Sequence, residues 1–301
     1  MQTTFTITGD FTVPRIGYGA MRLTGQPNNY GPYLDWEAGK QLLRHGVELG
    51  IRFIDTARAY GPGWNERLVA DALAPYPDDL FIATKGGVVK KTVTARFLDG
   101  SPEGLRRDCE DSLQNLRVDC INLYQLHWVD ADVPLADSVA GLAALQKQGK
   151  IRRIGLCNVT LAQVKEALSI TPIASVQNRY SVADRQSDAI VEFCDGQGIL
   201  FIPYGPLGAD PMKPGAPLAS AGGPLAEVAE RLHVSQSQIA LAWLLHRSAN
   251  IVVIPGTTSR AHLEENVASA RIELDAESLQ SLERLGHSQT ASSSSEDREG
   301  K

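Results

Sequence analysis

Short apolar runs alternate with longer segments of helical periodicity along most of the chain. In residues 36–49, for example, Leu42, Leu43, Val47 and Leu49 recur at the spacing of one helix face. Each such segment, apart from the second of two consecutive helices after residue 224, follows an apolar run typical of a buried parallel strand. The predicted strands are residues 16–20, 52–55, 79–85, 120–127, 151–158, 174–180, 198–204 and 250–254. The predicted helices are residues 36–49, 65–73, 102–116, 135–148, 161–168, 186–194, 225–232, 235–247 and 259–268.

This order predicts an α/β protein, a (β/α)8 TIM barrel, because eight strand–helix units over roughly 250 residues is the number that such a barrel contains. The alternation of polar and apolar residues over 4–13 adds an N-terminal β-hairpin. A doubly wound sheet is the main alternative, but it usually has fewer units and a glycine-rich first turn. The two candidate turns, at 17–22 and 61–66, both depart from GxGxxG at the last position.

The domain organisation follows from the same pattern. Residues 1–287 are predicted to form the single barrel, and the polar stretch 288–301 (SQTASSSSEDREGK) is predicted to be a disordered tail. Residues 205–224 hold five glycines and five prolines, which is unusual for a loop between a strand and a helix. Long loops of this kind are often functional, so we expect a lid there.

Composition and charge narrow the class of protein. The 301 residues include 43% hydrophobic and 21% charged residues, and 29 basic against 35 acidic residues give a net charge of −6, which disfavours binding to nucleic acid. The longest apolar run, residues 239–245, is far below the roughly 18 residues of a membrane span. Because the four cysteines form no CxxC pair and no signal peptide is visible, we expect reduced thiols, a cytoplasmic location and no metal site.

Reactive side chains stand where several predicted strands end. Asp55 ends the second strand and Tyr60 follows it, Lys85 ends the third and His127 ends the fourth. Each residue also has an ordinary structural interpretation on its own. Asp55 could cap a turn, Tyr60 could pack its ring, Lys85 could be solvated and His127 could be a core imidazole. The carboxyl ends of barrel strands carry the active sites of this fold, so four titratable groups on three consecutive strands favour a catalytic interpretation.

The four groups also have compatible chemistry. A tyrosine has an ordinary pKa near 10, and a neighbouring ammonium is expected to lower it. Asp55 would supply the counter-charge that a buried Lys85 needs. A neutral His127 can donate a hydrogen bond to a substrate oxygen. The set is therefore suited to adding a proton to a carbonyl oxygen.

These residues resemble a known family. The segment from Asp55 to Gly61 (DTARAYG), with Asn65–Glu66, Thr84–Lys85 and Leu126–His127, resembles the Asp/Tyr/Lys/His tetrad of the aldo-keto reductases, and in particular their bacterial branch. The resemblance extends from residue 16 to about residue 285. Further matching motifs follow in family order at 155–158 (GLCN), 176–178 (VQN), 203–207 (PYGPL), 254–257 (IPGT) and 263–266 (LEEN).

The resemblance implies reduction of an aldehyde or ketone by hydride transfer from NADPH, with NADH less favoured and Tyr60 as the general acid. It implies contacts of Asn158 and Gln177 with the nicotinamide carboxamide and stacking of Tyr204 on the ring. The other nucleotide-binding positions that it implies are Gly205, Pro206, Leu207 and Gly208 for the pyrophosphate, Gly256, Thr257, Ser259 and Arg260 for the adenosine phosphate, and Glu265 and Asn266 for the adenine. Cys157, Gly205 and His262 depart from the residues that are frequent in the family at these positions.

The predicted substrate pocket is apolar and aromatic. Met21, Trp64 and Trp128, with Tyr30 or Tyr33 as further candidates, lie on predicted rim loops and would suit a hydrophobic or flat carbonyl compound. We expect a monomer. Two alternatives remain open: a nucleotide-sensing binding subunit on the same fold with little turnover, and a lyase that uses Lys85 as a Schiff-base nucleophile.

Overall fold

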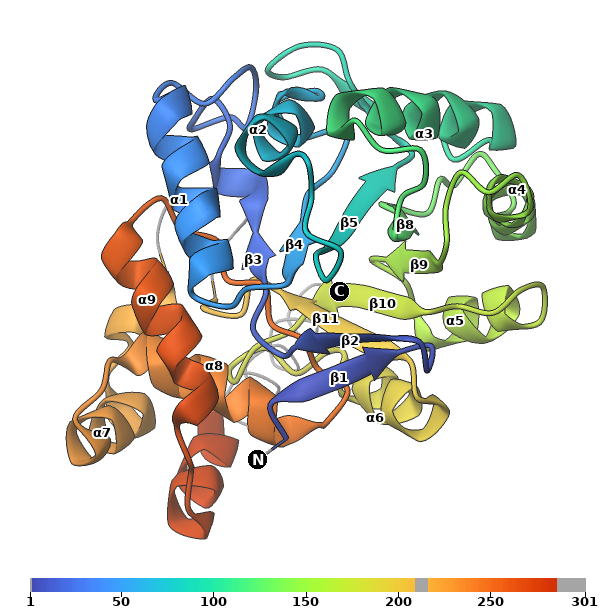
Figure 1. Cartoon of the computed structure of the whole chain (residues 1–301). Coiled ribbons are helices and arrows are strands. Elements are labelled where there is room, and N and C mark those ends of the chain that lie inside the picture. The colour runs from blue at the N-terminus through green and yellow to red at the C-terminus, as the bar shows by residue number, and fades with distance from the viewer. Residues whose placement is uncertain (1, 209–215, 286–301) are drawn as a thin grey trace, which may run out of the picture.

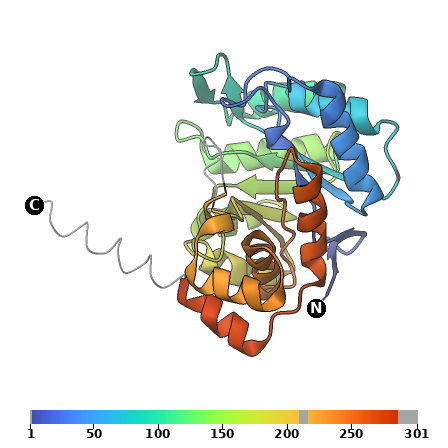
Figure 2. The ribbon, with the colours of Figure 1, turned by 90° about the vertical axis from the view of Figure 1, so that its left-hand side faces the viewer.

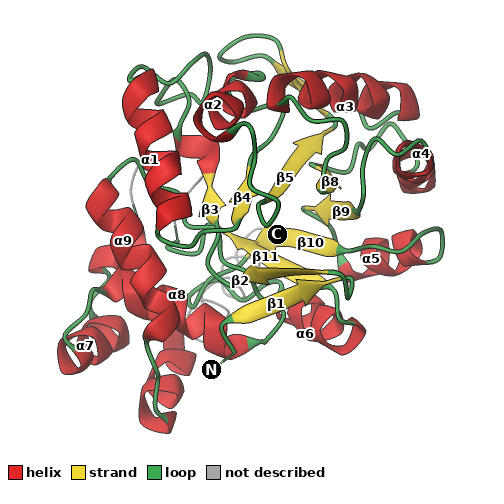
Figure 3. Cartoon of the chain, in the orientation of Figure 1, coloured by secondary structure: helices red, strands yellow, loops and turns green. Residues whose placement is uncertain are grey.

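A cylinder of parallel strands occupies the centre of the molecule, and helices surround it (Figures 1 and 3). The computed structural model describes residues 2–208 and 216–285, and within them seven strands pair in the order β11-β10-β9-β8-β5-β4-β3. These strands are β3 (Tyr18–Gly19), β4 (Phe53–Asp55), β5 (Phe81–Gly86), β8 (Leu123–Leu126), β9 (Ile154–Cys157), β10 (Ser175–Arg179) and β11 (Leu200–Tyr204).

The predicted eighth strand closes the cylinder with isolated bridges. Ile251 pairs in parallel with Phe201 of β11, and Val253 pairs in parallel with Ile16, just before β3. The segment around 251–253 therefore lies between the first and last strands of the sheet. The (β/α)8 barrel predicted from the sequence is confirmed.

The helices match the predicted periodicity closely. They are α1 (Trp36–Glu48), α2 (Trp64–Leu73), α3 (Pro102–Leu116), α4 (Leu135–Lys147), α5 (Leu161–Leu168), α6 (Asp188–Gln197), α7 (Gly223–Leu232), α8 (Gln236–Arg247) and α9 (Arg260–Ala268), and residues 276–285 are also helical. Thr160 and Ser235 begin α5 and α8 with capping boxes, and Ser101 caps α3 in front of its first-turn proline. Helix α6 starts two residues later than predicted and extends three residues further. No helix in the described part of the chain is both long and apolar enough to cross a membrane.

Two apolar layers hold the barrel together. The larger layer lies between the sheet and the helices, and the smaller one fills the barrel, with Phe53, Phe81 and Leu200 among its members. Ile7 and Val13 of the predicted N-terminal hairpin, β1 (Thr4–Ile7) and β2 (Phe11–Pro14), belong to the inner layer. The hairpin therefore covers one end of the barrel, at the right in Figure 2.

A second hairpin, which the periodicity analysis missed, lies at the other end of the barrel. It consists of β6 (Val88–Lys90) and β7 (Arg96–Leu98) and projects at the upper left in Figure 2. The Lys90 ammonium donates to the backbone oxygens of Asn28 (2.5 Å) and Asn29 (3.0 Å), and the Tyr30 hydroxyl donates to the oxygen of Lys91 (3.0 Å). These bonds join the hairpin to the loop that follows the short 3-10 helix η1 (Ala20–Arg22).

Two sequence predictions lie wholly or partly outside the described residues. The polar tail at 288–301 is one of them. The other is the lid expected at 205–224, of which 209–215 are not described. In the described part of that segment, residues 217–220 form the 3-10 helix η2 (Pro217–Ser220).

Candidate active site

The carboxyl ends of β4 and β5 bring Asp55 and Lys85 into direct contact. Lys85 Nζ donates to Asp55 Oδ1 at 2.6 Å and to the backbone oxygen of Thr56 at 2.8 Å. The exposed fractions of the Lys85 and Asp55 side chains are 0% and 3%. A charged amine at this depth needs both a counter-charge and further acceptors, and it has them here. The contact predicted from strand ends is therefore present.

Tyr60 and His127 meet beside this ion pair. Lys85 Nζ lies 5.2 Å from the centre of the Tyr60 ring, and the His127 ring stands edge-on to that ring at 5.9 Å and 82°. The loop after β4 turns back at Tyr60, whose backbone N–H donates to Ala57. The structure thus brings together all four residues that the sequence proposed for proton transfer.

Tyr60 keeps its proton at neutral pH. Burial raises the pKa of Tyr60 to about 12, while the charge of Lys85 opposes this shift and that of Asp55 adds to it. The sequence analysis expected the ammonium to lower the pKa of the tyrosine. The charge of Lys85 does act in that direction, but burial outweighs it, so the pKa of Tyr60 lies above its ordinary value. A protonated phenol is the form that can donate to a carbonyl oxygen.

Lys85 keeps its charge. Burial disfavours the ammonium, but Asp55 and then Tyr60 outweigh it and hold the pKa of Lys85 above its ordinary value. A Schiff-base lysine must be neutral to attack a carbonyl. The environment of Lys85 therefore disfavours the lyase alternative.

His127 is a neutral imidazole. Burial, reinforced by the charge of Lys85, lowers the pKa of His127 to about 3. Its Nδ1 is buried and has no hydrogen-bond partner among the described residues. We assign the ring proton to Nε2, because a buried donor without an acceptor is costly. His127 is then a hydrogen-bond donor for a ligand oxygen and not a source of protons.

Two glutamines hold the second oxygen of Asp55. Asp55 Oδ2 accepts from Gln177 Nε2 at 2.9 Å and from Gln125 Nε2 at 3.5 Å. Gln125 Oε1 in turn accepts from Cys157 Sγ (3.6 Å) and Ser175 Oγ (3.3 Å). The sequence analysis missed Gln125, although a polar residue two positions before His127 lies on the same face of its strand and could have been found.

Asn158 and Tyr204, predicted to contact the nicotinamide, lie together beside His127. Asn158 Nδ2 donates to the backbone oxygen of His127 at 2.9 Å, and Tyr204 Oη donates to Asn158 Oδ1 at 2.8 Å. Gln177, predicted for the same group, instead donates to Asp55. The side-chain amides of Asn158 and Gln177 therefore already have protein partners, which a bound carboxamide would have to share or replace.

The next predicted positions form a tight turn after β11. Gly205 and Gly208 have φ of +65° and +74°, which favour glycine, and the N–H of Gly208 donates to the oxygen of Gly205 at 2.9 Å. Pro206 and Leu207 complete the turn, and Leu207 packs on the outer apolar layer.

The start of α9 holds the remaining predicted positions. Ser259 caps the helix, its N–H donates to Thr257 Oγ1 at 3.0 Å, and a Cβ at Gly256 would lie 2.6 Å from the oxygen of Gly19. The Arg260 side chain is 71% exposed and its Nε lies 3.2 Å from Glu264 Oε1. Further along the helix, Glu265 is exposed and Asn266 is buried.

A family model supplies the observation that decides the identity of this barrel. The model of the aldo/keto reductase family matches residues 15–287. The chain belongs to the aldo/keto reductase family. The resemblance stated from the sequence motifs is thus confirmed. The protein is an NAD(P)-dependent oxidoreductase that acts on small molecules.

Individual relatives of this aldo/keto reductase agree with the assignment. An uncharacterized oxidoreductase of Schizosaccharomyces pombe is 42% identical over 290 residues, covering 96% of this chain and 92% of the relative. Pyridoxine 4-dehydrogenase of Escherichia coli is 40% identical over 286 residues, covering 93% and 97%. The structure of an aldo-keto reductase from Klebsiella pneumoniae in complex with NADPH matches with a TM-score of 0.78 at 26% identity, covering 95% of each chain.

The residues of this aldo/keto reductase fit a dinucleotide. A helix N-terminus such as that of α9 attracts a phosphate group, and Arg260 adds a positive charge there. The glycines at 205 and 208, with their positive φ angles, would let the backbone approach a ligand without side chains in the way. Within residues 2–208 and 216–285, no cluster of three or more His, Cys, Asp or Glu side chains is arranged to hold a metal ion.

The residues predicted for the substrate pocket have different surroundings. Trp128, next to His127, is 40% exposed. Trp64 stands edge-on to Trp36 at 6.1 Å and 90°, so part of its ring packs against α1. Met21 lies in η1 and is partly buried. Trp128 is therefore an exposed aromatic residue that directly follows a tetrad member in the chain.

Proposed function

We propose that this aldo/keto reductase reduces an aldehyde or ketone to an alcohol with NADPH, and that Tyr60 donates the proton. The observation that carries the proposal is the buried, protonated Tyr60 beside the Lys85–Asp55 ion pair and the neutral His127. A protonated donor, a charge that stabilises its conjugate base and a hydrogen-bond donor are the groups that carbonyl reduction requires.

In the proposed reaction, His127 Nε2 donates a hydrogen bond to the carbonyl oxygen and orients it. The chemistry that NADPH supplies when bound is a hydride for the carbonyl carbon. Tyr60 transfers its proton to the oxygen, so the C=O double bond becomes a C–O–H group. Lys85 stabilises the phenolate left on Tyr60, and Asp55 keeps Lys85 charged and in place.

The choice of NADPH over NADH rests on the start of α9. NADPH differs from NADH by a 2′-phosphate. Arg260 and the backbone N–H groups of the first turn of α9, which Ser259 caps, would offer positive charge to this phosphate. The Klebsiella pneumoniae relative, which was solved with NADPH, supports the same choice.

We further propose a flat aromatic aldehyde of the pyridoxal type as a substrate. The Escherichia coli relative at 40% identity is a pyridoxine 4-dehydrogenase, whose substrate is the corresponding alcohol. Trp128, the residue after His127 in the chain, is 40% exposed, and its aromatic surface would suit a planar ring.

The test is a substrate panel with the purified full-length chain. The consumption of NADPH is monitored by its absorbance. The proposal predicts consumption with pyridoxal and with nitrobenzaldehyde, and none without a carbonyl compound. Binding of NADPH without turnover of any aldehyde or ketone would instead support the nucleotide-sensing subunit. A covalent adduct on Lys85 after borohydride treatment with substrate would support the lyase.

A further inference from the structure

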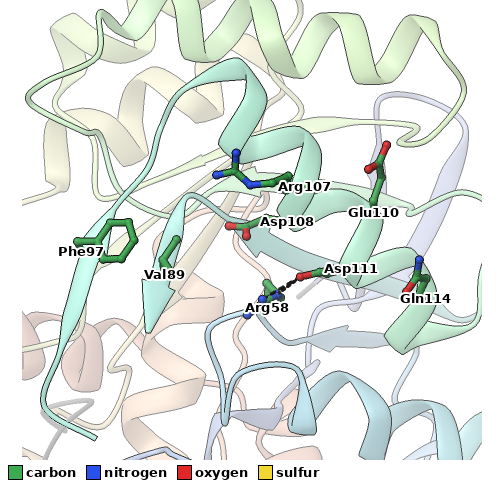
Figure 4. Close-up of a pocket in the computed structure, with 8 residues that line it drawn as sticks. All are labelled: Arg58, Val89, Phe97, Arg107, Asp108, Glu110, Asp111 and Gln114. Atoms are coloured by element: carbon green, nitrogen blue, oxygen red, sulfur yellow. Dashed lines mark hydrogen bonds and ion pairs between the residues drawn. The ribbon is translucent and has the colours of Figure 1, made fainter. Parts of the chain in front are cut away.

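Arg58 lies two residues before Tyr60, and its side chain points out of the barrel. The guanidinium lines a hollow of about 330 Å³. Residues of α3 and of the β6–β7 hairpin line it as well (Figure 4). Arg58 Nε and Nη2 lie 2.9 Å and 2.8 Å from Asp111 Oδ2 on α3. The loop that carries Tyr60 is thus attached to α3 from the outside.

The charge of Arg58 also acts on two buried carboxylates. Burial raises the pKa of both Asp108 and Glu66, and the charge of Arg58 counteracts the shift at each. Burial also disfavours the charge of Arg58, but its acidic neighbours, with Asp111 and Asp108 first among them, outweigh this and raise the pKa of Arg58. Arg58 therefore serves as the counter-charge of three acidic side chains.

One of these carboxylates is bonded to β5, which carries Lys85, and the other to the residue that follows this strand. Glu66 Oε1 accepts from Thr84 Oγ1 at 2.6 Å, and Asp108 Oδ2 accepts from the N–H of Gly87 at 2.9 Å. Thr84 and Gly87 lie on either side of Lys85 in the chain. The charge of Arg58 thus connects its loop with the part of the chain that holds the lysine.

The backbone of Arg58 reinforces this connection. Its N–H donates to the oxygen of Lys85 at 3.1 Å, and its own oxygen accepts from the N–H of Gly63 at 2.8 Å. Arg58 therefore joins the end of the turn that carries Tyr60 to the neighbouring strand. A shift of Arg58 would change the distance between Tyr60 and Lys85.

We propose that Arg58, held by Asp111, is a positioning residue that fixes Tyr60 for proton transfer. The proposal rests on the proposed function, in which Tyr60 is the proton donor. Small misplacements of reacting groups cost up to about a hundredfold in rate, so loss of the attachment should be visible in the chemical step.

The experiment is a single-turnover measurement of NADPH oxidation with saturating aldehyde. We expect Asp111→Ala to lower the rate about fivefold and Arg58→Met by about ten- to a hundredfold, with the amplitude unchanged. Arg58→Lys should recover most of the loss. Glu110→Ala is the matched control, because Glu110 is the neighbouring residue on α3 and its ion pairs are with Arg106 and Lys150.

The rate and the amplitude separate positioning from folding. Unchanged rates in Asp111→Ala and Arg58→Met overturn the proposal, and so does a loss of amplitude at an unchanged rate, which would mean fewer folded molecules. An equal loss of rate in Glu110→Ala also overturns it. Tyr60→Phe belongs in the same series. If Tyr60→Phe is inactive while the Arg58 variants are normal, only the positioning role fails, and if Tyr60→Phe is active, the proposed function fails.

Discussion

Lys85 Nζ lies 2.6 Å from Asp55 Oδ1, although thirty residues separate the two in the chain. The register of β4 and β5 pairs Asp55 with Ala83, so that Lys85 extends just beyond the end of β4. Both side chains are buried, and neither charge is stable there without the other. The pair couples the stability of the barrel to its proposed chemistry, and the first predictions follow from this coupling.

Replacing Tyr60 by phenylalanine keeps the ring and removes the proton. We expect turnover of an aldehyde to fall by about 10²–10⁴, the usual contribution of a general acid. The affinity for NADPH, measured by fluorescence titration, should stay within twofold of the wild type. A variant that keeps more than half of the wild-type single-turnover rate would show that Tyr60 is not the proton donor.

Lys85→Met should affect both stability and activity. It leaves the Asp55 carboxylate buried without its counter-charge, so we expect the free energy of unfolding, measured with urea, to fall by about 3–5 kcal/mol. Turnover should also fall strongly, because the phenolate of Tyr60 loses its stabilising charge.

The double variant Tyr60→Phe/Lys85→Met checks whether the two residues act as one unit. Residues that serve the same step are not additive, so the double variant should turn over little more slowly than either single variant. Independent, additive losses would contradict the coupling that we infer from the 5.2 Å between Lys85 Nζ and the Tyr60 ring.

The buried His127 should make the protein less stable in mild acid. Its pKa is lowered from 6.5 to about 3 by burial, so below pH 6.5 the unfolded chain binds a proton that the folded chain does not. Between pH 7 and 5 this difference destabilises the folded state by about 2 kcal/mol, at 1.36 kcal/mol per pKa unit. Urea unfolding of His127→Gln should lack this part of the pH dependence.

His262→Gln is the control for this measurement, because His262 is exposed. It should keep the pH dependence of the wild type. The same shift predicts that the reduction rate shows no inflection from His127 between pH 5 and 8. An inflection that disappears in His127→Gln would contradict the assignment of a neutral imidazole.

Arg260→Ala tests the choice of cofactor. We expect the affinity for NADPH to fall by about 1–2 kcal/mol, which is modest because the side chain is exposed, while the affinity for NADH stays within twofold. Arg271→Ala, at another exposed arginine, is the control. An equal loss for both cofactors would rule out recognition of the 2′-phosphate.

The order of elements could be predicted because each signal is local. The cap at Ser101, the capping box at Thr160 and the apolar runs of the strands all lie within a few residues of the feature that they determine. The hairpin of β6 and β7 was missed because its stability depends on the distant Asn28, Asn29 and Tyr30. The eighth strand was predicted from its apolar run. Its neighbours in the barrel decide that it pairs through isolated bridges, and the sequence does not report this.

The site shows the same division. The tetrad was found because each member ends a strand or follows one closely, and the ends of parallel strands meet. The links of Asp55 to Gln125 and Gln177 span 70 and 122 residues, and no local pattern reports them. Even the direction of the shift in the pKa of Tyr60 required the structure, since it depends on how deeply the ring is buried.

The bonds of Lys90 and Tyr30 have a consequence for the evolution and engineering of this rim. The β6–β7 hairpin and the loop after η1 form one exchangeable unit, because each supplies hydrogen-bond partners to the other. A graft of the hairpin alone from a relative would remove the ammonium that the oxygens of Asn28 and Asn29 bind, and both segments would lose their shape. Changes of substrate preference that involve this part of the rim should therefore be inherited, or transplanted, as paired replacements of two segments that lie some sixty residues apart.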